Sequence, residues 1–243
     1  MEDVVLWTGA GQIGMAIARR IGFDKKIVVG DKKIENARAI SKIMEEAGFD
    51  IISVETDISS RESILNLIEE CQKYGEITTF INAAGVSPSQ ASIEEILKVD
   101  LYGTAVLLEE VGKVIAAGGA GVTISSQSGH RMPQLGKEID EQLAAAPTEE
   151  LLDLEVLQPE NIKDTLHAYQ MAKRCNEKRV MFEAVRWGEK DARINSISPG
   201  IIVTPVAELL LLPKGAFITG SDFLLDGGAT ASYFYGPLQP EEE

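Results

Sequence analysis

Short runs rich in β-branched residues alternate with longer amphipathic stretches along most of this 243-residue chain. The strand-like runs lie at residues 4–7, 26–29, 51–54, 79–81, 122–124, 194–197 and 217–225. Helical patterns lie between most of them, at residues 13–21, 34–47, 62–74, 93–115 and 164–187. Helical crossovers join parallel strands and cover both faces of their sheet, so the pattern predicts a doubly wound α/β fold. We expect a Rossmann fold of about seven strands, in one domain over residues 1–243.

The composition limits the partners of this chain. Its formal net charge of −15 would repel nucleic acid and anionic membranes. Cys71 and Cys175 lie far apart in helical patterns, which favours reduced, packed thiols over a disulfide or a metal site. The chain starts Met1-Glu2-Asp3 and shows neither a signal peptide nor a long apolar run. We therefore expect a cytoplasmic protein that binds small molecules and no metal.

A glycine-rich turn follows the first predicted strand and opens the first predicted helix. Residues 9–14 read Gly-Ala-Gly-Gln-Ile-Gly, a spacing that permits a tight turn and brings a pyrophosphate close to the N–H groups of a helix N-terminus. Asp31 ends the second strand, where a carboxylate can bind the adenosine ribose and repel a 2′-phosphate. The sequence therefore predicts NAD rather than NADP. Lys32 and Lys33 keep NADP open, although the first turn of a solvated helix explains them better.

Tyr169 and Lys173 form a candidate pair for acid/base chemistry. Four residues apart, they share one face of a predicted helix. The pKa of a phenol is ordinarily about 10, and a neighbouring ammonium favours the phenolate. The pair alone is weak evidence, because a tyrosine ring and a lysine stem at this spacing also cover apolar surface on many helices.

Five motifs together resemble the short-chain dehydrogenase/reductase family over nearly the whole chain. They are the glycine turn at 9–14, Asn-Ala-Ala-Gly at 82–85, Ser-Ser-Gln-Ser-Gly at 125–129, Tyr169-x-x-x-Lys173, and Pro-Gly at 199–200. The resemblance implies an oxidoreductase that transfers a hydride between NAD(H) and a secondary alcohol or ketone. It also implies that Tyr169 exchanges a proton with the substrate oxygen and that Lys173 binds the nicotinamide ribose.

The resemblance further assigns the catalytic serine and the cofactor contacts. The family's Ser-x-x-Gly spacing selects Ser126 over Ser125 and Ser128 as the hydrogen-bond donor to the substrate oxygen. Asp57 would contact the adenine, and residues 82–85 would close over its ribose. The residues implied to bind the cofactor are Gly9, Gly11, Gln12, Ile13, Gly14, Asp31, Lys32, Asp57, Ile58, Asn82, Ala83, Ala84, Gly85, Tyr169, Lys173, Pro199, Gly200, Ile202 and Thr204.

Two motifs depart from the family pattern. The glycine turn is one residue shorter than the usual T-G-x-x-x-G-x-G, which shifts the register of its phosphate contacts. Asp100 stands where the family usually has a catalytic asparagine. If that position acts through its backbone carbonyl, holding a water that leads to Lys173, the exchange is tolerable; if the side-chain amide is needed, proton relay is impaired. A buried carboxylate could also be the counter-ion of Lys173, so Asp100 joins Ser126, Tyr169 and Lys173 in the catalytic set.

A long insertion separates the serine motif from the tyrosine motif. The extra segment, residues 131–162, is acidic and carries leucines at positions 135, 143, 151, 152, 154 and 157. Thr148 is expected to cap a helix within it. Because long insertions in compact domains are usually functional, we expect a wall of the substrate pocket or an arm that reaches a neighbouring subunit. A solvent-facing embellishment is the alternative. His130 and His167 lie close to the two motifs, and structural roles are favoured over substrate contacts for both.

The segment after the Pro-Gly motif is short. The family usually places a helical lid over the substrate between this motif and the last strand, but here only residues 201–216 intervene. Residues 206–212 are typical of the end of a helix, so the lid is missing between Pro205 and Val206. Either the chain is shortened there or the sequence lacks residues of the full protein, and we favour the second explanation.

Three functions are compatible with these motifs. Ser126, Tyr169 and Lys173 together favour an NAD-dependent dehydrogenase. Asp100 and the short segment after the Pro-Gly motif weakly favour a non-catalytic dinucleotide-binding or sensor protein. An NAD-dependent epimerase or dehydratase would use the same cofactor site. The helices expected at 93–115 and 164–187 resemble the pair through which the family assembles, so we also expect a homodimer or homotetramer.

Overall fold

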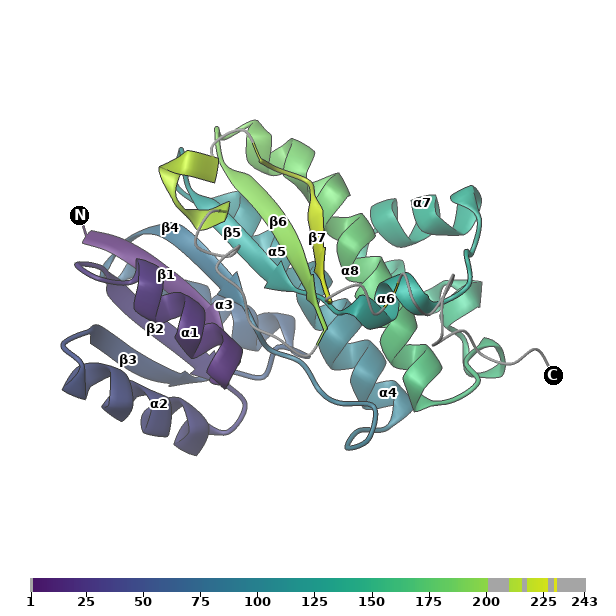
Figure 1. Cartoon of the computed structure of the whole chain (residues 1–243), viewed down its shortest axis with the longest axis horizontal. Helices are drawn as coiled ribbons and strands as arrows, with labels where there is room; N and C mark the ends of the chain where they lie inside the picture. The colour runs from purple at the N-terminus through teal and green to yellow at the C-terminus, as the bar shows by residue number, and fades with distance from the viewer. Residues whose placement is uncertain (1, 201–209, 216–217, 227–229, 231–243) are drawn as a thin grey trace.

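The computed structural model describes residues 2–200, 210–215, 218–226 and 230. Within them, seven strands form one sheet in the order β3-β2-β1-β4-β5-β6-β7, and every neighbouring pair is parallel (Figure 1). The strands are β1 Glu2–Thr8, β2 Lys26–Asp31, β3 Asp50–Glu55, β4 Gly75–Asn82, β5 Ala120–Ile124, β6 Arg193–Pro199 and β7 Asp222–Leu225. The chain winds outward from β1 to β3 and then returns to β4 on the other side of β1. The doubly wound fold expected from the sequence is confirmed.

Helices cover both faces of this sheet. The α-helices are α1 Gln12–Ile21, α2 Ile34–Glu46, α3 Arg61–Gln72, α4 Ile93–Ile96, α5 Thr104–Val114, α6 Gln127–Arg131, α7 Lys137–Ala145 and α8 Thr165–Gly188. The helices α1 and α2 pack on the face nearer the viewer in Figure 1, and α3, α5 and α8 pack on the opposite face.

The central strand β1 shows why the strand-like runs are continuously apolar. Val5 and Trp7 pack toward α1 and α2, whereas Val4 and Leu6 pack toward α3, α5 and α8. All four side chains are fully buried. Because successive side chains point to opposite faces, a strand covered on both sides needs apolar residues at every position.

The carboxyl ends of the strands bring the sequence motifs to one edge of the sheet. The glycine loop follows β1, Asp31 ends β2 and Asn82 ends β4. Ser125 follows β5, and Pro199 ends β6. In a parallel sheet these ends meet at the same edge, where doubly wound proteins bind their ligands.

The helix expected over residues 93–115 is interrupted by a wider turn. Ser92 caps α4 by accepting a hydrogen bond from the N–H of Glu95. A π-helical stretch, Leu97–Gly103, then joins α4 to α5. Such wide turns inside a helix are rare and frequently mark functional sites. This one contains Asp100, whose side chain is fully buried.

The insertion forms a compact arm of short helices. After α7 it continues as 3-10 turns at Thr148–Asp153, Glu155–Leu157 and Pro159–Asn161. Thr148 does begin one of these turns, but the prediction that its side chain caps the helix is wrong. Its hydroxyl instead bonds to the carboxylate of Glu109 on α5.

The arm packs on its own chain, at the right of the molecule in Figure 1. Its side chains Leu143, Leu151, Leu157 and Ile162 are buried in one cluster with residues of α8 and of the π-helical stretch. Within the described residues the arm therefore packs one side on α8. Its role as a pocket wall, an arm to a neighbouring subunit or a solvent-facing embellishment stays a prediction.

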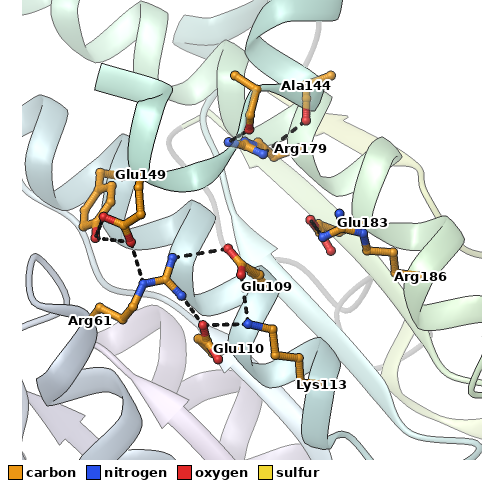
Figure 2. A network of polar contacts seen from close by, with 11 residues as sticks. Arg61, Glu109, Glu110, Lys113, Ala144, Glu149, Arg179, Glu183 and Arg186 are labelled. Carbon is orange, nitrogen blue, oxygen red and sulfur yellow. Dashed lines mark hydrogen bonds and ion pairs between the residues drawn. The ribbon is translucent and has the colours of Figure 1, made fainter. Parts of the chain in front are cut away.

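Polar contacts fasten the arm at both ends of α7. The guanidinium of Arg174 on α8 donates two hydrogen bonds of 2.7 Å to Asp140. Arg179, one turn further along α8, donates to the carbonyl oxygens of Ala144 and Ala146 at 3.3 and 2.7 Å. A third contact joins the arm to α3. The Nε of Arg61 lies 2.6 Å from the Oε1 of Glu149 (Figure 2).

The expected lid lies outside the described residues. The junction at Pro205 and Val206 and most of the helix expected at 206–212 belong to this part of the chain. Of that helix, Leu210, Leu211 and Leu212 are described, and the first two are buried.

Candidate cofactor and catalytic site

The glycine loop is shaped by close packing as well as by its turn. Gly9 has a φ of +83°, and a side-chain carbon there would lie 2.4 Å from the backbone nitrogen of Ala84. A side-chain carbon on Gly14 would meet the indole of Trp7 at 2.1 Å. Gly11, by contrast, faces open space. Two glycines therefore allow the loop to pack, and the third leaves room for a ligand.

Asp31 holds the glycine loop at the end of β2. Its Oδ2 accepts a hydrogen bond from the N–H of Ala10 at 2.9 Å, and its Oδ1 accepts one from the N–H of Lys33 at 2.9 Å. The side-chain amide of Asn36 donates a longer bond of 3.3 Å. The carboxylate is thereby fixed at the edge of the sheet.

A cavity of about 460 Å³ opens between the glycine loop and the ends of β2, β3 and β4. Its walls include these members of the expected cofactor set: Gly9, Gly11, Asp31, Lys32, Asp57, Ile58, Ala83, Ala84 and Gly85. The open approach at Gly11 and the fixed carboxylate of Asp31 fit the adenosine and phosphate half of a dinucleotide.

Asp57 and Lys32 form an ion pair on the wall of this cavity. The Lys32 Nζ lies 3.0 Å from Asp57 Oδ2. Although burial opposes the effect, hydrogen bonds from Ser59 and the charge of Lys32 lower the pKa of Asp57. Lys32 is therefore already paired with a carboxylate.

Four members of the expected cofactor set do not line this cavity: Gln12, Ile13, Gly14 and Asn82. The Oδ1 of Asn82 accepts a hydrogen bond from Thr8 at 2.9 Å, and its Nδ2 donates to Thr104 at 3.3 Å. With an exposed fraction of 1%, this side chain ties β1 and β4 to α5. The residues that follow it, 83–85, present their backbone to the cavity.

Tyr169 and Lys173 share one face of α8, as expected. The Lys173 Nζ lies 5.2 Å from the centre of the Tyr169 ring. Lys173 is buried, and its ammonium donates a hydrogen bond of 3.4 Å to the carbonyl oxygen of Ile124 at the end of β5. This contact holds the cation at the edge of the sheet where the strand ends meet.

Asp100 lies on the other side of Lys173. Its Oδ1 is 3.8 Å from the Lys173 Nζ and accepts a hydrogen bond from the N–H of Val86 at 3.0 Å. Its Oδ2 is buried and has no hydrogen-bond partner among the described residues. Burial raises the pKa of Asp100, and Lys173 only partly offsets that effect.

The three serines after β5 have distinct environments. Ser125 donates to the carbonyl oxygen of Lys173 at 2.9 Å and is buried. Ser126 caps α6, its Oγ accepting a bond of 3.1 Å from the N–H of Ser128. Because the hydroxyl proton of Ser126 is not used by that bond, it remains available to a substrate oxygen.

The Pro-Gly motif closes the site on the side of β6. The N–H of Gly200 donates to the carbonyl oxygen of Leu225 on β7, which joins the motif to the last strand. Pro199 is the final residue of β6. Ile202 and Thr204, expected near the carboxamide, lie outside the described residues.

One polar cluster was not expected from the sequence. His130 on α6, Glu177 on α8 and Asp222 on β7 bring their polar atoms within 4.8 Å of one another. Glu177 follows Lys173 by four residues, so helical periodicity already places it on the same face. A larger cavity of about 890 Å³ between α7 and α8 reaches His130 but is lined by none of the expected cofactor or catalytic residues.

The fold and the glycine loop define a protein of the dinucleotide-binding class. A family model described as short chain dehydrogenase matches residues 3–137. The short-chain dehydrogenase/reductase bsc3 of Alternaria brassicicola is 34% identical over 265 residues, covering 95% of this chain and 96% of that protein. The chain belongs to the short-chain dehydrogenase/reductase family of oxidoreductases, enzymes that use NAD or NADP on small-molecule substrates.

Solved structures show the same fold. A levodione reductase superposes with a TM-score of 0.73 at 20% identity, over 95% of this chain and 98% of that one. A short-chain dehydrogenase/reductase from Serratia marcescens gives a TM-score of 0.70 at 18% identity, over 94% and 98%. At these identities the likeness concerns the fold alone. Among the described helices, none combines the length and apolar character needed to cross a bilayer.

Proposed function

We propose that this protein transfers a hydride between NAD(H) and a secondary alcohol or ketone, with Tyr169 as the acid/base. The observation that carries the proposal is the placement of the Lys173 ammonium 5.2 Å from the centre of the Tyr169 ring. This pair lies at the same sheet edge as the glycine loop and the serine that caps α6. Bound nicotinamide would supply or accept the hydride.

Three side chains would transfer the proton and stabilise the charge that develops during the reaction. In the reducing direction, the Tyr169 hydroxyl donates its proton to the ketone oxygen, and in the oxidising direction it accepts the alcohol proton. The Lys173 ammonium stabilises the resulting phenolate and anchors the nicotinamide ribose. The Ser126 hydroxyl donates a hydrogen bond to the substrate oxygen as negative charge develops there.

Asp100 would serve as the counter-ion of Lys173. Its full burial, its 3.8 Å distance from the ammonium and its unpartnered Oδ2 support this role. Burial raises the pKa of this carboxyl group, and the neighbouring ammonium opposes that effect by favouring the charged form. The aspartate would thereby take the place of the family's asparagine in the proton relay.

The preference for NAD rests on the charges at the adenosine end of the cavity. The carboxylate of Asp31 would repel a 2′-phosphate, and Lys32 is paired with Asp57. Lys33 also borders the cavity, and its backbone N–H donates to Asp31, which keeps that carboxylate beside it. NADP is therefore the weaker candidate.

A turnover assay tests the proposal. The wild-type chain is incubated with NAD or NADP and a panel of cyclic and open-chain secondary alcohols, and absorbance of the reduced nicotinamide is followed. We expect turnover of at least one alcohol, with a higher kcat/KM for NAD than for NADP. Tight NAD binding without turnover of any alcohol or ketone would support the non-catalytic alternative instead.

A further inference from the structure

A three-residue cluster ties the short helix α6 to α8 and β7. The Nε2 of His130 lies 2.6 Å from Asp222 Oδ2 and 3.3 Å from Glu177 Oε1. Ser196 and Ser198 both donate to the other oxygen of Asp222, at 2.7 and 2.9 Å. The imidazole is therefore the only group in this cluster that can bring positive charge to the two carboxylates.

The distances indicate that a proton, rather than a metal ion, joins these groups. Two ligands bound tetrahedrally to one zinc ion, each at about 2.0–2.1 Å, would lie about 3.3 Å apart. The 2.6 Å between His130 and Asp222 is shorter and matches a charge-assisted hydrogen bond. Consistently, the hydrogen bond to Asp222 raises the pKa of His130.

The cluster lies at the end of the segment that carries Ser126. Between them, Gly129 packs so closely on α8 that a side-chain carbon would lie 2.7 Å from Glu177 Oε1 and 2.8 Å from the backbone nitrogen of Arg174. Ser125 bonds to the backbone of Lys173 on the same helix. Residues 125–130 are thus fastened to α8 along the stretch that begins with Lys173.

We propose that His130 is a positioning residue whose imidazole, hydrogen-bonded to Asp222 and in contact with Glu177, fixes α6 and so places Ser126 beside Tyr169 and Lys173. This inference rests on the proposed function of Ser126. His130 touches neither substrate nor cofactor in this account and acts only through the helix that Ser126 caps.

The tie depends on pH in a defined direction. The charged groups facing His130 are Glu177 and Arg174 on α8 and Asp222 on β7. Arg174 opposes protonation of His130, but Asp140 of α7 holds its guanidinium in two 2.7 Å bonds. As pH rises through the raised pKa of His130, the imidazole loses its charge and its charge-assisted hydrogen bond to Asp222 weakens.

A histidine titration by NMR tests the electrostatic part, and it needs no enzymatic activity. The chain contains two histidines, His130 and His167. We expect one imidazole to titrate above the ordinary histidine pKa and to disappear from the spectrum of His130→Gln. The other should titrate below it, because burial and then Lys163 lower the pKa of His167. Asp222→Asn should lower the first pKa and leave the second unchanged, because the hydrogen bond to Asp222 is the largest cause of the raised pKa. A His130 that titrates at or below the ordinary value would overturn the proposal.

Kinetics and hydrogen exchange test the positioning part. We expect His130→Ala to lower kcat about 10- to 100-fold, since a shift of about 1 Å in a positioned group costs as much. The Kd for NADH should stay within about twofold, because the cofactor cavity is not touched. His130→Gln should recover most of kcat through its amide donor, and the ratio of wild-type to His130→Gln activity should fall as pH rises. Glu183→Gln, a buried carboxylate further along α8, is the matched control and should leave kcat unchanged.

The outcomes separate this proposal from the proposed function. If His130→Ala keeps wild-type kcat, the cluster is merely structural and the positioning role is overturned, while dehydrogenase activity stands. If the wild-type chain turns over no substrate, the proposed function fails. Amide exchange then still decides the positioning role: faster exchange over residues 125–131 in His130→Ala supports it, and unchanged exchange overturns it.

Discussion

Gly11 and Gly14 belong to the same turn but have different roles: Gly14 allows close packing, and Gly11 leaves room for a ligand. A side-chain carbon on Gly14 would collide with Trp7, whereas one on Gly11 would enter the space next to the cofactor cavity. We predict that Gly14→Ala destabilises the fold by about 1–3 kcal/mol through overpacking. Gly11→Ala should change stability by less than about 0.5 kcal/mol and weaken NADH binding. Urea unfolding and fluorescence titration with NADH check both effects, and a Gly11→Ala protein with wild-type affinity would argue against phosphate binding at this turn.

The raised pKa of Glu177 makes the free energy of unfolding depend on pH. Burial and the nearby Asp222 raise the pKa of Glu177 from 4.5 to about 7, so the folded chain holds this proton more tightly than the unfolded chain. The resulting stabilisation is complete below pH of about 4.5 and is lost as pH rises to about 7, a change on the order of 3 kcal/mol.

Replacing this carboxyl by an amide should therefore reduce the dependence of stability on pH. We predict that Glu177→Gln loses less free energy of unfolding than the wild type between about pH 5 and pH 8, as measured by urea unfolding at each pH. The exposed Glu189, near the end of the same helix, provides the control, and Glu189→Gln should behave as the wild type. Parallel pH curves for wild type and Glu177→Gln would contradict the raised pKa.

At the scale of secondary-structure elements, the strands and long helices could be predicted from the sequence. The local departures from regular helical geometry could not. Val4 to Trp7 are apolar at every position, which already indicates a strand covered on both faces. The π-helical stretch around Asp100 leaves no comparable pattern, and within it Asp100 contacts Val86 and Lys173. These contacts join segments far apart in the chain, so periodicity alone does not reveal them.

The arm shows the same limit. Its acidic composition and leucines predicted helical turns with a buried side, but not the surface on which they pack. That surface is set by Arg174 and Arg179, which lie after the arm in sequence and bind Asp140 and the carbonyl oxygens at the end of α7. A sequence pattern shows that an amphipathic segment needs a partner surface without showing which one.

Two arginines on α8 allow a direct test of how the arm is held. Arg179 has an exposed fraction of 2% and binds two carbonyl oxygens of the arm. Arg186, also in Figure 2, has an exposed side chain that pairs with Glu183 and lies over the ring of Phe182. We predict that Arg179→Met costs about 1–3 kcal/mol of stability and speeds amide exchange over residues 137–149. Arg186→Met should cost less than about 0.5 kcal/mol, as expected for an exposed ion pair. Equal losses in the two variants would contradict this account of the anchor.

At the scale of the whole molecule, the arm changes the expectation for assembly. The sequence pointed to association through α5 and α8, but the arm lies on these helices. Its Glu149 reaches Arg61, which also pairs with Glu109 and Glu110 of α5 (Figure 2). The arm therefore covers part of this helix pair, while Met181 and Val185 of α8 remain exposed. The homo-oligomer itself remains a prediction.

Light scattering can test this revision. Glu149→Lys would break the contact of the arm with Arg61, whose three neighbouring carboxylates include Glu149. We predict that the solution mass of the variant equals that of the wild type, whatever that mass is, because the interface between copies does not involve this contact. A change in the number of copies on mutation would show that the α5 and α8 face takes part in assembly after all.

The central claim is that Tyr169 performs proton transfer next to a bound nicotinamide. The sequence predicted this pair because its residues are four apart on one helix, and the structure adds the buried environment of Lys173. The most direct measurement compares wild type and Tyr169→Phe with the best alcohol of the panel, at saturating NAD, alongside the Kd for NADH of both proteins. We predict a fall in kcat of about 100- to 10,000-fold, since only the acid/base group is lost, with the Kd within about twofold. Undiminished turnover in Tyr169→Phe would contradict the mechanism.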